Sequence, residues 1–169
     1  MVSQKMKVPI KTPNKDWSLA IESNYNDEAQ LQEIIYKHPQ IIPLEDINPE
    51  CENRKLFTIK ELGLSCGSTD VVIIDDKGEI YVIETKLATN NEIKRTVIGQ
   101  ILEYAAYLWQ QDFEWLDRSV IKKHGRGLSE QFQNIKDWVK EDFEDAVANN
   151  LREGIFKLVI VVDKVNDGL

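Results

Sequence analysis

Apolar residues in the middle of the chain form two short runs in which consecutive positions, rather than alternate ones, are apolar. The runs are residues 71–74 and 80–83, and the polar segment between them ends in Gly78. Runs of this kind are typical of strands buried on both faces. A three-residue loop with a left-handed glycine would join them. The pattern therefore predicts a buried antiparallel hairpin in which Ile74 faces Ile80 and Val72 faces Val82.

Segments with helical spacing, and two further apolar runs, surround this hairpin. Residues 1–26 are polar and predict an extended arm with one short strand near residues 17–21. The expected helices span residues 27–38 (capped by Asn26 or Asp27), 91–110, 112–123 and 129–150, with further strands at 55–62 and 156–162. The order helix, three strands, helices, strand predicts one mixed α/β domain over residues 27–169. Because the chain ends soon after an expected central strand, this domain is compatible with a truncated or N-terminal part of a longer protein.

Three charged residues lie within the predicted hairpin. Asp70 directly precedes the first run, and Glu84 and Lys86 continue the second. In the predicted register Asp70 is opposite Glu84, and directly opposed Cβ atoms lie roughly 4.5–5.5 Å apart. Burying unpaired carboxylates costs several kcal/mol, so the pair needs a common partner. A divalent cation is one such partner, and a structural salt bridge with Lys86 is the alternative.

This arrangement resembles the PD-(D/E)XK nuclease superfamily, whose pattern is an Asp on one strand and Asp/Glu-x-Lys on the next. The matching positions are Asp70 and Glu84-Thr85-Lys86, and Gln100-x-x-x-Tyr104 matches a motif on the following helix. Thr69 stands where the motif name has Pro. The resemblance covers about residues 27–163 and implies a restriction-endonuclease-like fold, an αβββαβ core with a mixed central sheet flanked by helices.

The resemblance also implies a catalytic site. It implies that Mg²⁺ or Mn²⁺ is held by the side chains of Glu28, Asp70 and Glu84 and by the carbonyl of Thr85. It assigns catalytic roles to Asp70, Glu84, Lys86, Gln100 and Tyr104. Lys86 would orient or deprotonate the attacking water or neutralise charge on the phosphate, and its protonation state is left open by the sequence.

The charge of the chain argues against a stand-alone nucleic-acid-binding domain. The 169 residues carry a formal net charge of −8, whereas DNA-binding domains usually carry a basic excess. Residues 86–126, which follow the predicted site, have a local basic excess. The basic side chains that could contact a phosphate backbone there are Lys94, Arg95, Arg118, Lys122, Lys123 and Arg126. A further domain or subunit with a basic surface is therefore an expected partner.

The composition of the chain predicts its cellular compartment. No apolar run approaches the roughly 20 residues of a membrane span, so no membrane partner is expected. Cys51 and Cys66 have neither metal-ligand spacing nor a disulfide framework, which favours a reduced, cytoplasmic compartment.

Two functions follow as expectations. The first is a metal-dependent phosphodiesterase acting on DNA in restriction, repair or defence. The second is an inactive nuclease-fold domain that serves as an interaction or scaffold module. The sequence leaves open DNA versus RNA, endonuclease versus exonuclease, and monomer versus homodimer.

Overall fold

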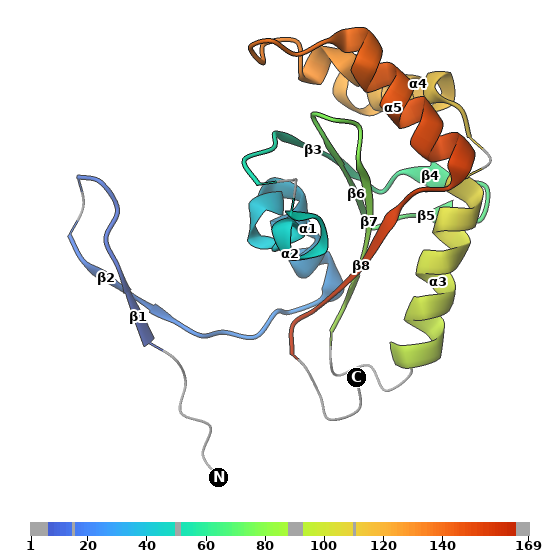
Figure 1. The fold of residues 1–169 in the computed structure, drawn as a ribbon. Coiled ribbons are helices and arrows are strands. Elements are labelled where there is room, and N and C mark those ends of the chain that lie inside the picture. The colour runs from blue at the N-terminus through green and yellow to red at the C-terminus, as the bar shows by residue number, and fades with distance from the viewer. Residues whose placement is uncertain (1–6, 15, 50–51, 88–92, 110, 165–169) are drawn as a thin grey trace.

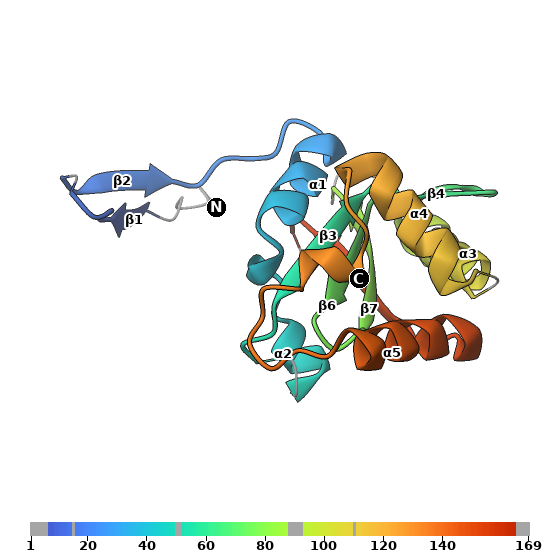
Figure 2. The same ribbon diagram turned by 90° about the horizontal axis from the view of Figure 1, so that it is seen from above.

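The computed structural model describes residues 7–14, 16–49, 52–87, 93–109 and 111–164, without the side chains of 93–95. Its body is a four-stranded mixed sheet with helices on both faces (Figures 1 and 2). The strand order across the sheet is β3 (Leu56–Lys60), β6 (Val71–Asp75), β7 (Ile80–Lys86) and β8 (Lys157–Val162). Only β7 and β8 are parallel. The predicted mixed α/β class and element order are confirmed.

The register of the central hairpin is the predicted one. Ile74 lies opposite Ile80 and Val72 lies opposite Val82. Gly78 adopts a φ of 83°, and its N–H donates to the carbonyl of Asp75 at 3.0 Å. The Asp75 carboxylate accepts the N–H groups of Lys77 and Glu79, which fixes the loop. Continuing this register places Asp70 opposite Glu84.

Alternate residues of β6 and β7 enter two separate hydrophobic cores, which explains why their apolar positions are consecutive. The even-numbered residues pack with α3 (Ile93–Leu108), α4 (Phe113–His124) and α5 (Lys140–Glu153). The odd-numbered residues pack with α1 (Glu28–Lys37) and α2 (Leu44–Ile47). Glu84 therefore belongs to the face covered by α3, whereas Thr85 belongs to the face covered by α1.

Helix ends mostly follow the local sequence signals. Asp27 caps α1 by accepting the N–H of Gln30 at 2.8 Å, and a 3₁₀ turn, η1 (Pro39–Ile41), follows the helix. Asp112 caps α4 by accepting the N–H of Trp115 at 2.7 Å. A left-handed Gly125 ends that helix.

The prediction of a helix over residues 129–150 is wrong for the first half of that range. A short 3₁₀ turn, η3 (Ser129–Gln131), is followed by turns, and α5 begins only at Lys140. Asp137 takes a left-handed φ of 58°, which no helix tolerates. Trp138 donates from its indole nitrogen to the carbonyl of Asp76 at 2.9 Å. The apolar residues at helical spacing in this segment therefore pack into the core although their backbone is not helical.

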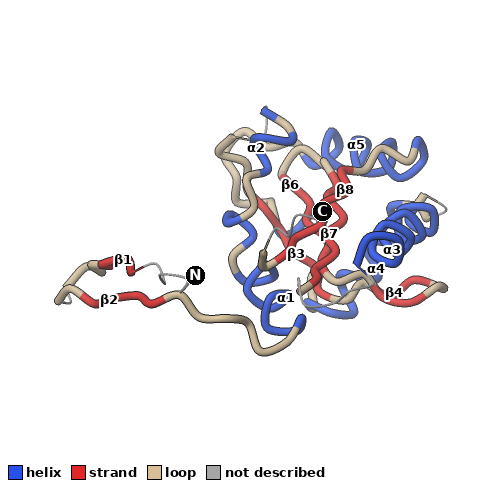
Figure 3. The backbone as a smooth tube through the Cα atoms, turned by 90° about the horizontal axis from the view of Figure 1, so that it is seen from below, coloured by secondary structure: helices blue, strands red, loops and turns tan. Residues whose placement is uncertain are grey.

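Near the N-terminus, β1 (Lys7–Ile10) and β2 (Ser18–Ile21) pair as an antiparallel hairpin, where the sequence predicts a single strand near residues 17–21. It projects away from the body and is called the arm below (Figures 1 and 3). A second small hairpin, β4 (Gly63–Leu64) and β5 (Gly67–Ser68), precedes β6. Among the residues described, no helix combines the length and apolar character needed to cross a membrane.

Candidate functional site

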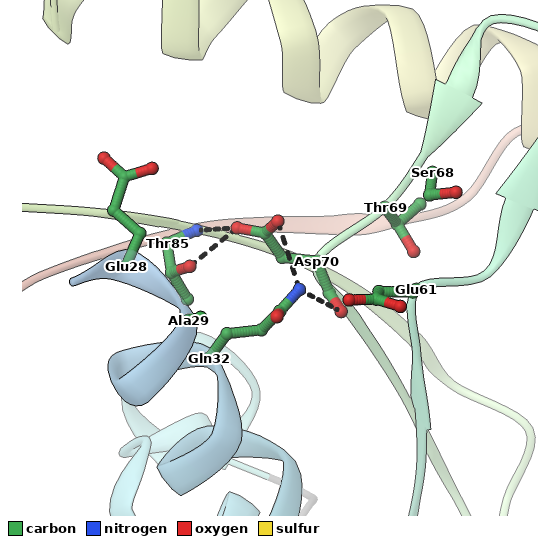
Figure 4. Close-up of a pocket in the computed structure, with 8 residues that line it drawn as sticks. All are labelled: Glu28, Ala29, Gln32, Glu61, Ser68, Thr69, Asp70 and Thr85. Atoms are coloured by element: carbon green, nitrogen blue, oxygen red, sulfur yellow. Dashed lines mark hydrogen bonds between the residues drawn. The ribbon is translucent and has the colours of Figure 1, made fainter.

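The predicted site residues gather at the end of the sheet where β6 begins and β7 ends. A cavity of about 330 Å³ lies there between α1 and the sheet (Figure 4). It is lined by Glu28, Ala29, Gln32, Glu61, Ser68, Thr69, Asp70 and Thr85. Three of the four predicted metal-ligand residues therefore line one cavity, whereas Glu84 faces α3.

Asp70 is held by hydrogen bonds from two directions. Its Oδ2 atom accepts the backbone N–H of Thr85 at 2.7 Å and the Thr85 hydroxyl at 2.6 Å. Gln32 Nε2 donates to Asp70 Oδ1 at 3.3 Å and to the Asp70 carbonyl at 3.1 Å (Figure 4). The carboxylate thus joins the start of β6 to the end of β7 and to α1.

Gln32 is a site residue that the sequence reasoning missed. It lies one helical turn after Glu28 and is buried, next to Leu31 and near Ile35 on α1. A polar residue among the buried positions of an amphipathic helix was the available signal, because a buried amide requires hydrogen-bond partners.

Glu84 is the least solvated carboxylate of the predicted set, with 1% of its surface exposed. Its Oε1 atom lies 3.3 Å from Lys86 Nζ, and its Oε2 atom is buried with no hydrogen-bond partner among the described residues. Burial, and then the nearby negative charge of Asp70, raise the pKa of Glu84 to about 7, although Lys86 opposes this shift. A carboxylate with an unpaired buried oxygen favours a cation or a proton as its partner.

Lys86 connects the two sides of the sheet at the end of β7. Its Nζ atom lies 3.2 Å from Glu28 Oε2 and 3.3 Å from Glu84 Oε1. Burial alone lowers the pKa of Lys86, but the hydrogen bonds and charges of Glu28 and Glu84 outweigh it and raise the pKa overall. The raised pKa favours the charged ammonium form of Lys86 over a free base.

Gln100 and Tyr104 approach from α3, on the face that Glu84 occupies. Gln100 Oε1 is buried and has no hydrogen-bond partner within the described part of the chain. The pKa of the buried Tyr104 is raised by its burial and by the negative charges of Glu84 and Asp70. Within the described residues, β7 and α3 thus each contribute a buried acceptor without a hydrogen-bond partner, Glu84 Oε2 and Gln100 Oε1.

The four expected metal-ligand residues do not form one compact group. No three His, Cys, Asp or Glu side chains among the described residues lie close enough together to hold an ion. Lys86 lies between Glu28 and Glu84. Asp70 and Glu84 remain as a pair, and Mg²⁺ is often bound by only one or two carboxylates together with water and phosphate oxygens. The orphaned Oε2 of Glu84 fits such an ion.

The basic residues of α4 lie near the other end of the sheet. His124, at the end of α4, packs edge-on against Phe57 with ring centroids 4.9 Å apart, and Phe57 pairs with Ile74 beside the turn. Lys122 and Lys123 precede His124 directly. The side chains of Lys94 and Arg95 lie outside the described residues. Lys122 and Lys123 therefore lie away from Asp70.

No family model, curated protein or solved structure matches this chain significantly. The site is therefore interpreted from its own geometry.

The hydrogen bonds of Asp70 predict a difference between two substitutions. Asp70→Ala leaves the N–H and hydroxyl of Thr85 without an acceptor and is expected to cost about 1–3 kcal/mol of unfolding free energy. Asp70→Asn keeps an oxygen that can accept from Thr85, and Gln32 can turn its own amide to face the amide of the new asparagine. A smaller loss of unfolding free energy is therefore expected. Urea unfolding measures both. Equal losses would mean that the charge of Asp70, rather than its acceptor geometry, stabilises the fold.

Proposed function

We propose that this chain is a metal-dependent phosphodiesterase that acts on DNA through a PD-(D/E)XK-type site. The observation that carries the proposal is Glu84, a buried carboxylate with one unpaired oxygen, beside Lys86 and near Asp70. The register that the motif requires, with Asp70 opposite Glu84, is the continuation of the observed β6–β7 pairing. A buried, undercompensated carboxylate at such a position is typical of functional sites.

Asp70 and Glu84, with the carbonyl of Thr85, would hold Mg²⁺ or Mn²⁺, and Glu28 would contribute if Lys86 moved aside. Such an ion, when bound, acidifies a water molecule and stabilises charge on the scissile phosphate. Glu84 must lose its proton to serve as a ligand. Its raised pKa therefore makes binding dependent on pH.

The raised pKa of Lys86 bears on which of its expected roles it would take. Its raised pKa favours a fixed positive charge that neutralises the phosphate over a base that deprotonates water. Glu28 and Glu84 orient this ammonium from opposite sides. Gln100 and Tyr104 would close the α3 side of the site, where Gln100 Oε1 still lacks a donor.

A second function is favoured by a different observation. Asp70 is already bound by Thr85 and Gln32, and Lys86 is already bound by two carboxylates. A network satisfied in this way can also serve structure alone, as in an inactive nuclease-fold domain that binds another protein. The net charge of −8 is consistent with that alternative or with a basic partner that brings the DNA.

Cleavage assays with matched variants test the proposal. At low salt, which preserves weak contacts with phosphate, the protein is expected to cut DNA with Mg²⁺ or Mn²⁺ and to stop with a chelator. Lys86→Ala should reduce the rate at least about 100-fold while metal binding, measured by calorimetry, persists. Glu84→Ala should abolish both. Single-stranded DNA and RNA substrates, assayed in parallel, define the substrate class.

Lys157→Ala is the control, because Lys157 also pairs with a glutamate, Glu79, but from β8 near the turn of the hairpin. It should leave cleavage and metal binding unchanged. Activity that survives Lys86→Ala and Glu84→Ala would come from another site or a contaminant. A protein that neither binds metal nor cuts any of these substrates would favour the interaction module.

A further inference from the structure

The arm exposes a large apolar surface for its size. Its exposed large apolar side chains are Val8, Ile10, Trp17, Leu19 and Ile21. No described residue of the arm belongs to either hydrophobic core, and the arm extends away from the sheet (Figures 1 and 2). An isolated two-stranded hairpin is at best marginally stable in water. The arm therefore requires a surface to cover its apolar side chains.

The body carries an exposed apolar surface where α3 approaches β8. Ile98 and Leu102 on α3, and Trp109 directly after the last residue of the helix, are exposed and lie along one flank. Trp109 donates from its indole nitrogen to the carbonyl of Arg152 at 2.7 Å, which places this flank near the segment that enters β8.

Two residues of β8 extend this surface. Leu158 and Ile160 are exposed and pair with Val82 and Glu84, so they lie on the face of the sheet that α3 covers. Within the described residues β8 pairs only with β7, so its outer backbone groups are available to another strand. The five residues Ile98, Leu102, Trp109, Leu158 and Ile160 are called the β8–α3 surface.

The distribution of charge along the chain favours the arm of a second copy as the partner of this surface. Residues 1–26 carry four lysines and two acidic residues, whereas residues 27–169 carry 17 basic and 27 acidic residues. The part of the chain that contains the arm is thus net positive, by two charges, and the remainder is net negative, by ten. Opposite potentials favour encounter between the arm of one molecule and the body of another.

We propose that the arm of one copy of this chain covers the β8–α3 surface of a second copy, and that the exchange is reciprocal. The contact buries apolar side chains of the arm against those of the surface, and a strand of the arm can extend the sheet beyond β8. Because each copy supplies one arm and one surface, two copies close into a two-fold dimer with neither left exposed. This inference is independent of the proposed chemistry.

Sedimentation velocity on the whole chain at micromolar concentrations tests the dimer. The wild-type protein is expected to sediment as a dimer whose association weakens at high salt. Leu19→Asp in the arm and Leu102→Asp in the β8–α3 surface should each give folded monomers with an unchanged circular dichroism spectrum, because both side chains are exposed. Ile121→Asp is the control, since Ile121 is exposed on α4, outside both surfaces, and should leave the dimer intact.

Mixing the two monomeric variants makes the test specific. The Leu19→Asp protein keeps an intact surface and the Leu102→Asp protein keeps an intact arm, so their mixture should form a weaker heterodimer through one contact. A monomeric wild type would overturn the proposal. So would a dimer that survives Leu19→Asp. A dimer that is lost with Leu19→Asp but kept with Leu102→Asp would mean that the arms pair with each other, and would overturn it too.

Discussion

Gly78→Ala is expected to destabilise the protein by about 2–5 kcal/mol, because two independent costs meet at this position. Gly78 has a φ of 83°, which an alanine adopts only under strain. An added Cβ would also lie 2.9 Å from the Cβ of Ala146 and 3.0 Å from the backbone nitrogen of Val147. Neither atom can move unless α5 shifts as a whole.

Gly125→Ala separates these two costs. Gly125 has a similar φ of 74°, but no atom lies within 4 Å of the position its Cβ would take. The Gly125→Ala protein should lose only the unfolding free energy that the strained backbone conformation costs, about 1–2 kcal/mol. Urea unfolding of both variants measures the difference. Equal losses would mean that α5 yields freely at the turn, and would contradict the packing argument.

The hairpin register was predictable because a turn fixes it locally. Asp75 and Gly78 lie within four residues of each other and determine which side chains of β6 and β7 are opposed. The relation of Asp70 to Glu84 follows from that short-range choice. This explains how one stretch of sequence predicted the core of the sheet and the placement of the carboxylates.

Contacts between distant segments were less predictable. Gln32 meets Asp70, and Lys86 meets Glu28, only because α1 packs across the sheet at a particular angle. The irregular segment before α5 depends on Trp138 reaching a carbonyl 62 residues away in the chain. Periodicity reports which positions are apolar, but it carries no information on these long-range hydrogen bonds. The sequence therefore predicted the residues of the site better than their partners.

Glu84→Gln is expected to stabilise the metal-free protein at alkaline pH. The pKa of Glu84 is raised from its usual 4.5 to about 7, so the folded state binds this proton more tightly than the unfolded state. Its contribution to stability is complete below pH 4.5 and is lost as the pH rises through 7. The loss is on the order of 3 kcal/mol, and glutamine, which does not ionise, avoids it.

The difference in unfolding free energy between wild type and Glu84→Gln is the quantity to measure across this range. The buried Asp75, whose pKa is raised to about 6 by burial, shifts stability in the same direction but is present in both proteins and cancels. Added Mg²⁺ or Mn²⁺ should restore the wild type above pH 7 and leave Glu84→Gln unchanged, because a bound ion replaces the lost proton. A difference that does not vary with pH would mean that Lys86 keeps Glu84 ionised throughout. The pair would then be a structural salt bridge, and the main support for a metal site would be gone.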